Sequence, residues 1–355
     1  MRLKPVREQV VVVMGASSGI GRETALRFAR KGARVVASAR TAHGLHSVEE
    51  EIRSRGGECA VVVADVANIS QVRAVAARAE EQYGGIDTWV HAAGVQLYAP
   101  FEQTTPEEWF RVIDVNLNGQ AYGALVALPY LRRRGGGALI HITSIESRRP
   151  LPYQAAYSAA KHGVKALVET LRLELKHEGV PISVTEIIPG SIDTPLFNKA
   201  RTKLGVKPKG LAPIYPPESV ADAILYAASH PCRDLVVGGA AKMIAMGESL
   251  SPRIMDNLLE RYAFEGQRTR QPKSEEGPDA LFVPMDDDRI HGDLSARTRS
   301  GSMYTWMETH PWAVPALGLT ALGAFAMMAA GEKEAPERVR PRESRRRPAR
   351  RLTER

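Results

Sequence analysis

The amino-acid sequence predicts an α/β fold in which a doubly wound parallel sheet, a Rossmann fold, carries helices on both faces. A valine-rich run at 9–14 is ended by a glycine, as is typical of a strand buried on both faces. Similar apolar runs recur at 33–38, 60–64, 88–91, 138–143 and 182–188. Segments of helical period lie between them, at 23–31, 70–83, 106–133 and 155–177. This alternation predicts parallel strands joined by right-handed crossovers.

The pattern changes after the last of these strands. Residues 189–217 are rich in Pro, Lys and Gly, and a stretch of this length predicts a functional loop such as a substrate lid. Helical period returns at 218–228, a short strand is expected at 235–237, and an amphipathic helix is expected near 252–264. Residues 265–302 are polar and aperiodic, which predicts a linker or a loosely packed extension.

Composition excludes several classes of protein. The chain has 355 residues, 44% of them hydrophobic and 25% charged, which is ordinary for a globular protein. Its only cysteines, Cys59 and Cys232, are too far apart in sequence for a C-x-x-C site, and a disulfide scaffold is excluded. The net charge is +8, but residues 332–355 hold nine Arg and one Lys against five Glu, so +5 belongs to this tail. No aromatic residues are interleaved there, so nucleic acid is not the expected partner.

A glycine-rich loop follows the first strand and opens a helix with the spacing G-x-x-x-G-x-G. Glycines let the backbone approach a pyrophosphate closely, and the helix N-terminus favours its negative charge. The sequence therefore predicts a dinucleotide site built by Gly15, Ser17, Ser18, Gly19, Ile20 and Gly21.

The end of the second strand indicates which dinucleotide binds. Ala39 stands where a carboxylate would accept hydrogen bonds from an adenosine ribose, and Arg40 follows it. A guanidinium at this place can pair with a 2′-phosphate, so we expect NADP(H) to be preferred over NAD(H). Asp65 and Val66 close the third strand and are expected at the adenine.

A candidate catalytic set lies further along the chain. Tyr157 and Lys161 are four residues apart and share one face of a predicted helix, Ser144 ends the fifth strand, and Asn116 precedes it. A phenol has a pKa near ~10, so it needs a nearby ammonium group to exchange a proton at neutral pH. This combination suits carbonyl reduction or its reverse.

With these motifs, residues 6–247 resemble the short-chain dehydrogenase/reductase family. The resemblance also uses Asp65, Ala92-Ala93-Gly94 and Pro189-Gly190. It implies that Tyr157 is the general acid or base, that Ser144 polarises the substrate oxygen, and that Lys161 binds the nicotinamide ribose and lowers the Tyr157 pKa. Asn116 would hold a water in a proton relay. Pro189, Gly190 and Thr194 would lie beside the nicotinamide carboxamide.

The family further implies a small ketone or alcohol as substrate and a homo-oligomer, a dimer or tetramer, formed through the helices at 106–133 and 155–177. The alternative is a non-catalytic dinucleotide-binding sensor or scaffold. No metal site is expected, since the acidic run at 286–288 is interpreted as a solvated turn.

The carboxyl-terminal third extends beyond the resemblance. Residues 312–330 carry no charge but are weakly apolar, with seven Ala and two Gly. This segment could lie in a membrane interface, span the membrane or pack on a partner subunit, and the basic tail could contact anionic head groups. We expect a cytoplasmic protein that contacts the membrane surface through this region, which favours a lipophilic substrate. The predicted division is a catalytic domain at 1–250, an extension at 251–310, a hydrophobic segment at 311–331 and a disordered tail at 332–355.

Overall fold

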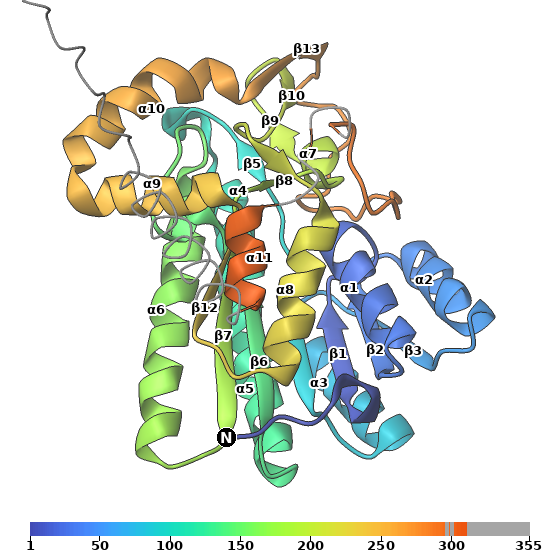
Figure 1. Ribbon diagram of the computed structural model, residues 1–355. Helices are drawn as coiled ribbons and strands as arrows, with labels where there is room; N and C mark the ends of the chain where they lie inside the picture. The colour runs from blue at the N-terminus through green and yellow to red at the C-terminus, as the bar shows by residue number, and fades with distance from the viewer. Residues whose placement is uncertain (295–297, 299–301, 311–355) are drawn as a thin grey trace, which may run out of the picture. The chain divides into compact units, whose positions relative to one another are not determined.

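A central sheet of parallel strands organises the structure, a computed structural model that describes residues 1–294, 298 and 302–310 (Figure 1). In spatial order its strands are β12 (Asp234–Val237), β7 (Ile182–Pro189), β6 (Gly137–Ile142), β4 (Thr88–His91), β1 (Val10–Met14), β2 (Arg34–Ala39) and β3 (Cys59–Val63). The direction of winding reverses between β1 and β4. Open α/β sheets bind ligands at the carboxyl ends of the strands beside such a reversal.

The valine run of β1 shows why this strand is buried. Val10, Val12 and Met14 point into one apolar cluster, whereas Val11 and Val13 point into the other. All five side chains are fully buried, because successive strand residues face opposite sides of the sheet and both sides are covered. Period and burial therefore agree with the prediction.

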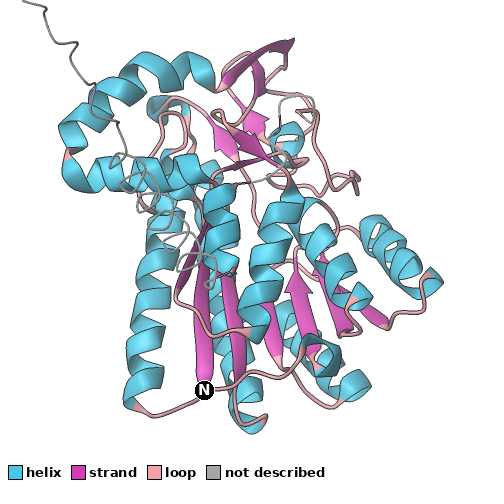
Figure 2. Ribbon diagram, in the orientation of Figure 1, coloured by secondary structure: helices cyan, strands magenta, loops and turns pink. Residues whose placement is uncertain are grey.

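Helices cover both faces of the sheet, as Figure 2 shows. One face packs against α3 (Ile69–Tyr83), α4 (Pro106–Ile113), α5 (Gly119–Arg133) and α6 (Ala155–His177). The other packs against α1 (Gly19–Arg30), α2 (Ala42–Ser54) and α8 (Pro217–Ser229). The predicted doubly wound α/β fold is confirmed. The helix expected at 106–133 contains one irregularity, a π-helical turn at Asp114–Asn118 between α4 and α5.

Short elements lie above the carboxyl ends of the sheet strands. They are β5 (Leu97–Tyr98), β8 (Ser191–Ile192), α7 (Leu196–Lys199), β9 (Arg201–Thr202), β10 (Val206–Pro208) and β11 (Ile214–Tyr215). The stretch 189–217 is thus a set of brief strands and one helical turn, not a plain loop. Two-residue pairings such as β5 with β9 and β8 with β11 leave no periodic signal in a sequence.

The chain beyond the sheet forms α9 (Gly239–Leu250), α10 (Pro252–Gly266), β13 (Arg268–Pro272) and α11 (Met303–Thr309). Sequence analysis expected α10 but neither α9 nor β13, which pairs antiparallel with β10. Residues Met1–Thr309 form one compact unit. The segment 312–330 and the basic tail lie outside the described residues, so their predicted membrane contact stays a prediction. Within the described ranges, no helix is both long enough and apolar enough to cross a membrane.

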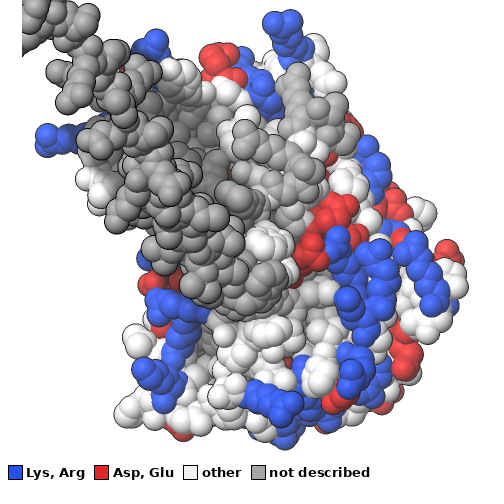
Figure 3. All heavy atoms as spheres, in the orientation of Figure 1, with Lys and Arg blue, Asp and Glu red and all other residues white. Residues whose placement is uncertain are grey.

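Charges of both signs are interspersed over the described surface that Figure 3 shows. Many of them are paired, for example Arg78 with Glu81 and Arg55 with Glu51. Exposed pairs of this kind contribute little to stability. They fit the sequence observation that most of the net charge belongs to the tail.

Candidate active site

The glycine-rich loop lies where β1 meets β4. Gly15 has a left-handed φ of +85°, and a Cβ there would lie 2.6 Å from the backbone nitrogen of Ala93. A Cβ on Gly21 would lie 2.1 Å from the carbonyl oxygen of Gly15. Only glycine fits these places, and the backbone they leave open is the cradle that a pyrophosphate needs. The residues present therefore fit a dinucleotide.

One pocket joins this loop to the candidate catalytic residues. With the exception of Asn116, every site residue expected from the sequence lines it: Gly15, Ser17, Ser18, Gly19, Ile20, Gly21, Arg40, Asp65, Val66, Ala92, Ala93, Gly94, Ser144, Tyr157, Lys161, Pro189, Gly190 and Thr194. These residues come from the carboxyl ends of six sheet strands, β1, β2, β3, β4, β6 and β7, and from α1, α6 and the segment after β7.

Tyr157, Lys161 and Ser144 meet at the inner end of the pocket. The Ser144 side chain lies near that of Tyr157 and lowers the pKa of the phenol. The Lys161 Nζ lies 5.4 Å from the centroid of the Tyr157 ring and donates to the carbonyl of Ile142 at 2.9 Å. All three side chains are buried. A phenol, a hydroxyl and an ammonium group thus converge on a space that can hold a carbonyl group.

The Asn116 side chain makes hydrogen bonds with backbone groups beside the pocket. Its Nδ2 donates to the carbonyls of Val95 and Val112 at 3.0 Å each, and its Oδ1 accepts from the Val95 N–H at 3.2 Å. The side chain lies in the π-helical turn and is fully buried. It ties the loop after β4 to α4, and its predicted role in holding a water stays a prediction.

Burial governs the proton affinities at this site. It lowers the pKa of Lys161 to about 8, against the opposing charges of Glu146 and Glu186. Burial, and next the charge of Glu146, raise the pKa of Tyr157, while the Ser144 side chain lowers it. The net direction is upward, because desolvation is the largest contribution. The lowering of the Tyr157 pKa by Lys161 stays a prediction.

Glu146 was missed by sequence reasoning. It lines the pocket, accepts a hydrogen bond from Ser158 Oγ at 2.6 Å, and is 4% exposed. Burial raises its pKa to about 8. A Glu in a three-residue turn after a strand carries no sequence signal that separates it from a surface residue.

Replacing Glu146 with Gln should stabilise the protein increasingly as pH rises. The ordinary carboxyl pKa of 4.5 is raised to about 8 in the fold, so the unfolded chain releases the proton first. The free-energy cost of ionising Glu146 in the folded state therefore appears above the unfolded pKa of 4.5 and is complete above the folded pKa of about 8. The gain of Glu146→Gln in free energy of unfolding should reach a few kcal/mol, on the order expected for such a shift. Urea titrations across this range, with the exposed Glu50→Gln as control, would contradict it if the gain did not change with pH.

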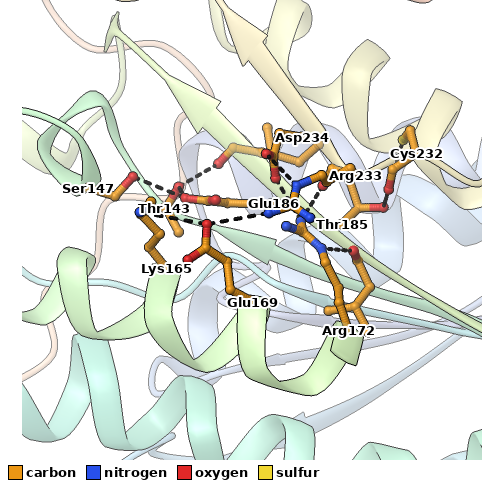
Figure 4. A network of polar contacts seen from close by, with 12 residues as sticks. Thr143, Ser147, Lys165, Glu169, Arg172, Thr185, Glu186, Cys232, Arg233 and Asp234 are labelled. Atoms are coloured by element: carbon orange, nitrogen blue, oxygen red, sulfur yellow. Dashed lines mark hydrogen bonds and ion pairs between the residues drawn. The ribbon is translucent and has the colours of Figure 1, made fainter. Parts of the chain in front are cut away.

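Glu186 holds the turn that carries Ser144 and Glu146. This buried carboxylate of β7 accepts from Thr143 Oγ1 at 2.8 Å and Ser147 Oγ at 3.0 Å, and Figure 4 shows these side chains together. It also pairs with Arg148 at 2.8 Å. A hydroxyl on a loop gains a fixed position only when its neighbours are fixed. Glu186 is therefore a positioning residue for the candidate catalytic serine.

Arg40 and Asp65, the residues expected at the adenosine, both line the pocket. The Arg40 guanidinium donates to the carbonyls of Ala280 at 2.6 Å and Phe282 at 3.3 Å. Asp65 pairs with Arg111 at 2.6 Å and accepts from the Ala67 N–H at 2.9 Å. Among the described residues Arg40 forms no ion pair, although the negative charge of Asp65 acts on its guanidinium.

Several pocket residues lie beyond the predicted set. Lys199 of α7 donates to Ser18 Oγ at 3.1 Å and so places a second cation beside the glycine loop. The carboxyl-terminal extension contributes Gln267, Ala280, Pro284 and Met285. These residues belong to segments that sequence analysis interpreted as lid and linker.

The fold and the site define a dinucleotide-dependent oxidoreductase that acts on hydroxyl or carbonyl groups. Residues 9–205 match the short chain dehydrogenase family, and the chain belongs to that family. Membership implies a nicotinamide dinucleotide and a small-molecule substrate.

Known proteins of different degrees of sequence and structural similarity support this assignment. An uncharacterized oxidoreductase of Bacillus subtilis (strain 168) is 38% identical over 313 residues, which is 88% of both chains. The 3beta-hydroxysteroid dehydrogenase 1 of Eggerthella lenta is 38% identical over 54% of this chain and 73% of its own length. The crystal structure of a 3-ketoacyl-ACP reductase from Sinorhizobium meliloti 1021 has a TM-score of 0.59 and 29% identity, covering 66% of this chain and 99% of that one. The first match is longer than the family region, so that likeness continues into the extension.

Proposed function

We propose that this protein is an NADP(H)-dependent enzyme that exchanges a hydride with the carbonyl or carbinol carbon of a small ketone or secondary alcohol. The observation that carries the proposal is the single pocket that joins the glycine loop to the buried group of Ser144, Tyr157 and Lys161. The bound nicotinamide would supply or accept the hydride. The names of two related proteins, a hydroxysteroid dehydrogenase and a ketoacyl reductase, denote the same kind of functional group.

The placement of these side chains supports a role for each of them. The Ser144 hydroxyl would donate to the substrate oxygen, and the Tyr157 phenol would deliver a proton to that oxygen during reduction or remove one during oxidation. Lys161 would hold the nicotinamide ribose, and its ammonium group would favour the Tyr157 phenolate once proton transfer begins. Glu186 would fix the serine by fixing the turn around it.

The apolar part of the pocket lining supports a substrate with a lipophilic portion. Leu151, Phe197 and Leu211 line it on the side of α7 and the segment after β11. Turnover of a panel of ketones and aldehydes, with NADPH and with NADH, tests the proposal. Reduction of none of them, together with oxidation of none of the matching alcohols, would contradict it.

Arg40 should determine the preference for NADP(H). Its guanidinium donates only to carbonyls among the described residues and can still pair with a 2′-phosphate. Arg40→Leu should lower the ratio of kcat/KM for NADPH to kcat/KM for NADH by about 10- to 100-fold, as expected for a lost charge-assisted hydrogen bond, because the lost contacts to Ala280 and Phe282 affect both cofactors equally. Steady-state kinetics with both cofactors measures this, and Arg55→Leu on the neighbouring helix is the control. A preference of the unmodified enzyme for NADH would overturn the assignment.

We also propose a homo-oligomer formed through α4, α5 and α6. Phe110, Leu125 and Leu173 lie exposed on these helices, at 63%, 62% and 70% respectively. Sedimentation equilibrium tests this assembly, and a monomer at micromolar concentration would exclude it.

A cytoplasmic location with membrane contact through residues 312–330 and the basic tail is a separate proposal. It is tested by fractionating cells that express the full chain or a chain ending at Thr309. If both chains stay in the soluble fraction, this proposal fails.

A further inference from the structure

A segment of the carboxyl-terminal extension lies across the dinucleotide pocket. Residues 279–294, named the strap here, follow β13 and contain no regular helix or strand. Nevertheless Leu281 is only 1% exposed and belongs to the same apolar cluster as β1 and α3. Ala280, Pro284 and Met285 line the pocket. In Figure 1 the orange chain after β13 runs past α7 toward α1 and α2.

Backbone carbonyls attach the strap to the adenosine end of the pocket. Those of Ala280 and Phe282 accept from Arg40, and that of Leu281 accepts from Arg111 Nε at 2.9 Å. Arg111 in turn pairs with Asp65. The strap thus contacts the guanidinium proposed for the 2′-phosphate and, through Arg111, the carboxylate expected beside the adenine.

A second set of contacts joins the strap to the pyrophosphate end. The N–H of Gly19, in the glycine loop itself, donates to the carbonyl of Arg289 at 2.9 Å. Lys199 donates to the carbonyl of Asp287 at 2.6 Å while it also contacts Ser18. The strap is therefore anchored at both ends of the region that an adenosine diphosphate unit would occupy.

A third contact fixes the strap to helices outside the pocket. Asp288 accepts from Ser47 Oγ of α2 at 2.6 Å and lies 3.5 Å from the Arg22 guanidinium of α1. Arg22 is 6% exposed, so this carboxylate meets a largely desolvated cation. Neither Ser47 nor Asp288 lines the pocket.

We propose that the strap is part of the cofactor site and sets how slowly the cofactor leaves. It forms one wall of the pocket and crosses it between Arg40 and Gly19, so a dinucleotide bound beneath it can leave only after these contacts open. The inference rests on the dinucleotide site of the proposed function, but not on the catalytic roles of Ser144 and Tyr157.

The test measures dissociation of NADPH from the full-length protein without substrate. Excess NADP⁺ displaces the reduced cofactor, and the loss of bound-NADPH fluorescence gives the rate. Asp288→Ala removes the contacts to Ser47 and Arg22 and should raise the rate about tenfold, as expected for a charged hydrogen-bond partner. Since no substrate is present, an enzyme that fails the turnover screen still reports on the strap.

The control is Asp222→Ala. This variant also removes an ion pair with an arginine of α1, Arg27, but neither residue of that pair belongs to the strap. NADPH should dissociate from this control variant at the same rate as from the unmodified protein. A rate for Asp288→Ala within twofold of the control would overturn the proposal, and NADH should show the same increase because both cofactors share the adenosine diphosphate unit.

Limited trypsin digestion decides the matter if Asp288→Ala does not fold. Cleavage after Arg289 requires release of the carbonyl that Gly19 holds, so its rate reports strap opening in the unmodified protein. Saturating NADPH should slow this cleavage at least severalfold relative to cleavage after the exposed Arg55. Equal rates with and without NADPH would refute the strap as a cofactor-retaining element.

Discussion

Tyr157→Phe should abolish most turnover and leave cofactor binding intact. The substitution removes only the hydroxyl that would exchange a proton with the substrate oxygen, and the ring remains in its buried place. General acid–base catalysis contributes about 10²- to 10⁴-fold, so kcat should fall by about three orders of magnitude. Steady-state kinetics and NADPH fluorescence titration measure the two quantities separately.

The matched control is Tyr98→Phe. Tyr98 is buried, lines the same pocket and is 2% exposed, yet the proposed mechanism gives its hydroxyl no proton to transfer. Its kcat should stay within about tenfold of the unmodified enzyme, the effect of one lost hydrogen bond. If Tyr157→Phe were as active as Tyr98→Phe, the phenol would not be the acid. Unchanged cellular function of Tyr157→Phe would favour the alternative of a non-catalytic dinucleotide sensor or scaffold.

Lys161→Met should reduce kcat/KM by about 10²- to 10³-fold, within the range for a lost charged contact combined with impaired proton transfer. Methionine fills a similar volume but carries no ammonium group to hold the ribose or favour the phenolate. The same variant should be no less stable than the unmodified protein. If Lys161 served only packing, Lys161→Met would instead lose stability and keep its activity.

The stability effect has a defined pH window. Burial lowers the pKa of Lys161 from 10.5 to about 8, so the unfolded chain binds this proton more tightly than the fold does. The cost of burying the ammonium is complete below the lower value and disappears above the higher one. The stabilisation by Lys161→Met should therefore be largest near neutral pH and shrink as pH rises toward ten or so. Thermal unfolding between neutral and alkaline pH measures it, and a loss of stability at neutral pH would contradict it.

Much of the fold could be predicted because its signals are local. The run of β1 is buried on both faces and every residue in it is apolar, and in β6 only His141 interrupts the apolar pattern, so a short window reveals it. The glycines and the Tyr157–Lys161 spacing are local too, since a tight loop and one helix face each occupy a few consecutive residues. All the residues in these two motifs line one pocket.

The rest of the site depends on contacts between distant segments. Residues 265–302 are polar and aperiodic, and several contacts of the described part of this segment with the site are made by backbone carbonyls, which every residue type possesses. Arg40 meets Ala280, and Gly19 meets Arg289, across more than half of the chain. Glu146 and Glu186 are ionisable residues that are buried by the fold around them, and no periodic pattern in the sequence predicts that burial. The contribution of the extension to the site is therefore visible in the structure but not in the sequence.

The burial of Leu281 bears on how this protein can be dissected. A chain cut at the predicted boundary near residue 250 would keep Ser144, Tyr157 and Lys161, yet it would lose Leu281 from the buried apolar cluster to which that side chain belongs and expose the surface that it covers. It would also leave the pocket open on one side. Expression work that trims the chain to its family region would thus yield an aggregation-prone fragment with weak cofactor affinity, and an inactive product of that kind would say nothing about the intact enzyme.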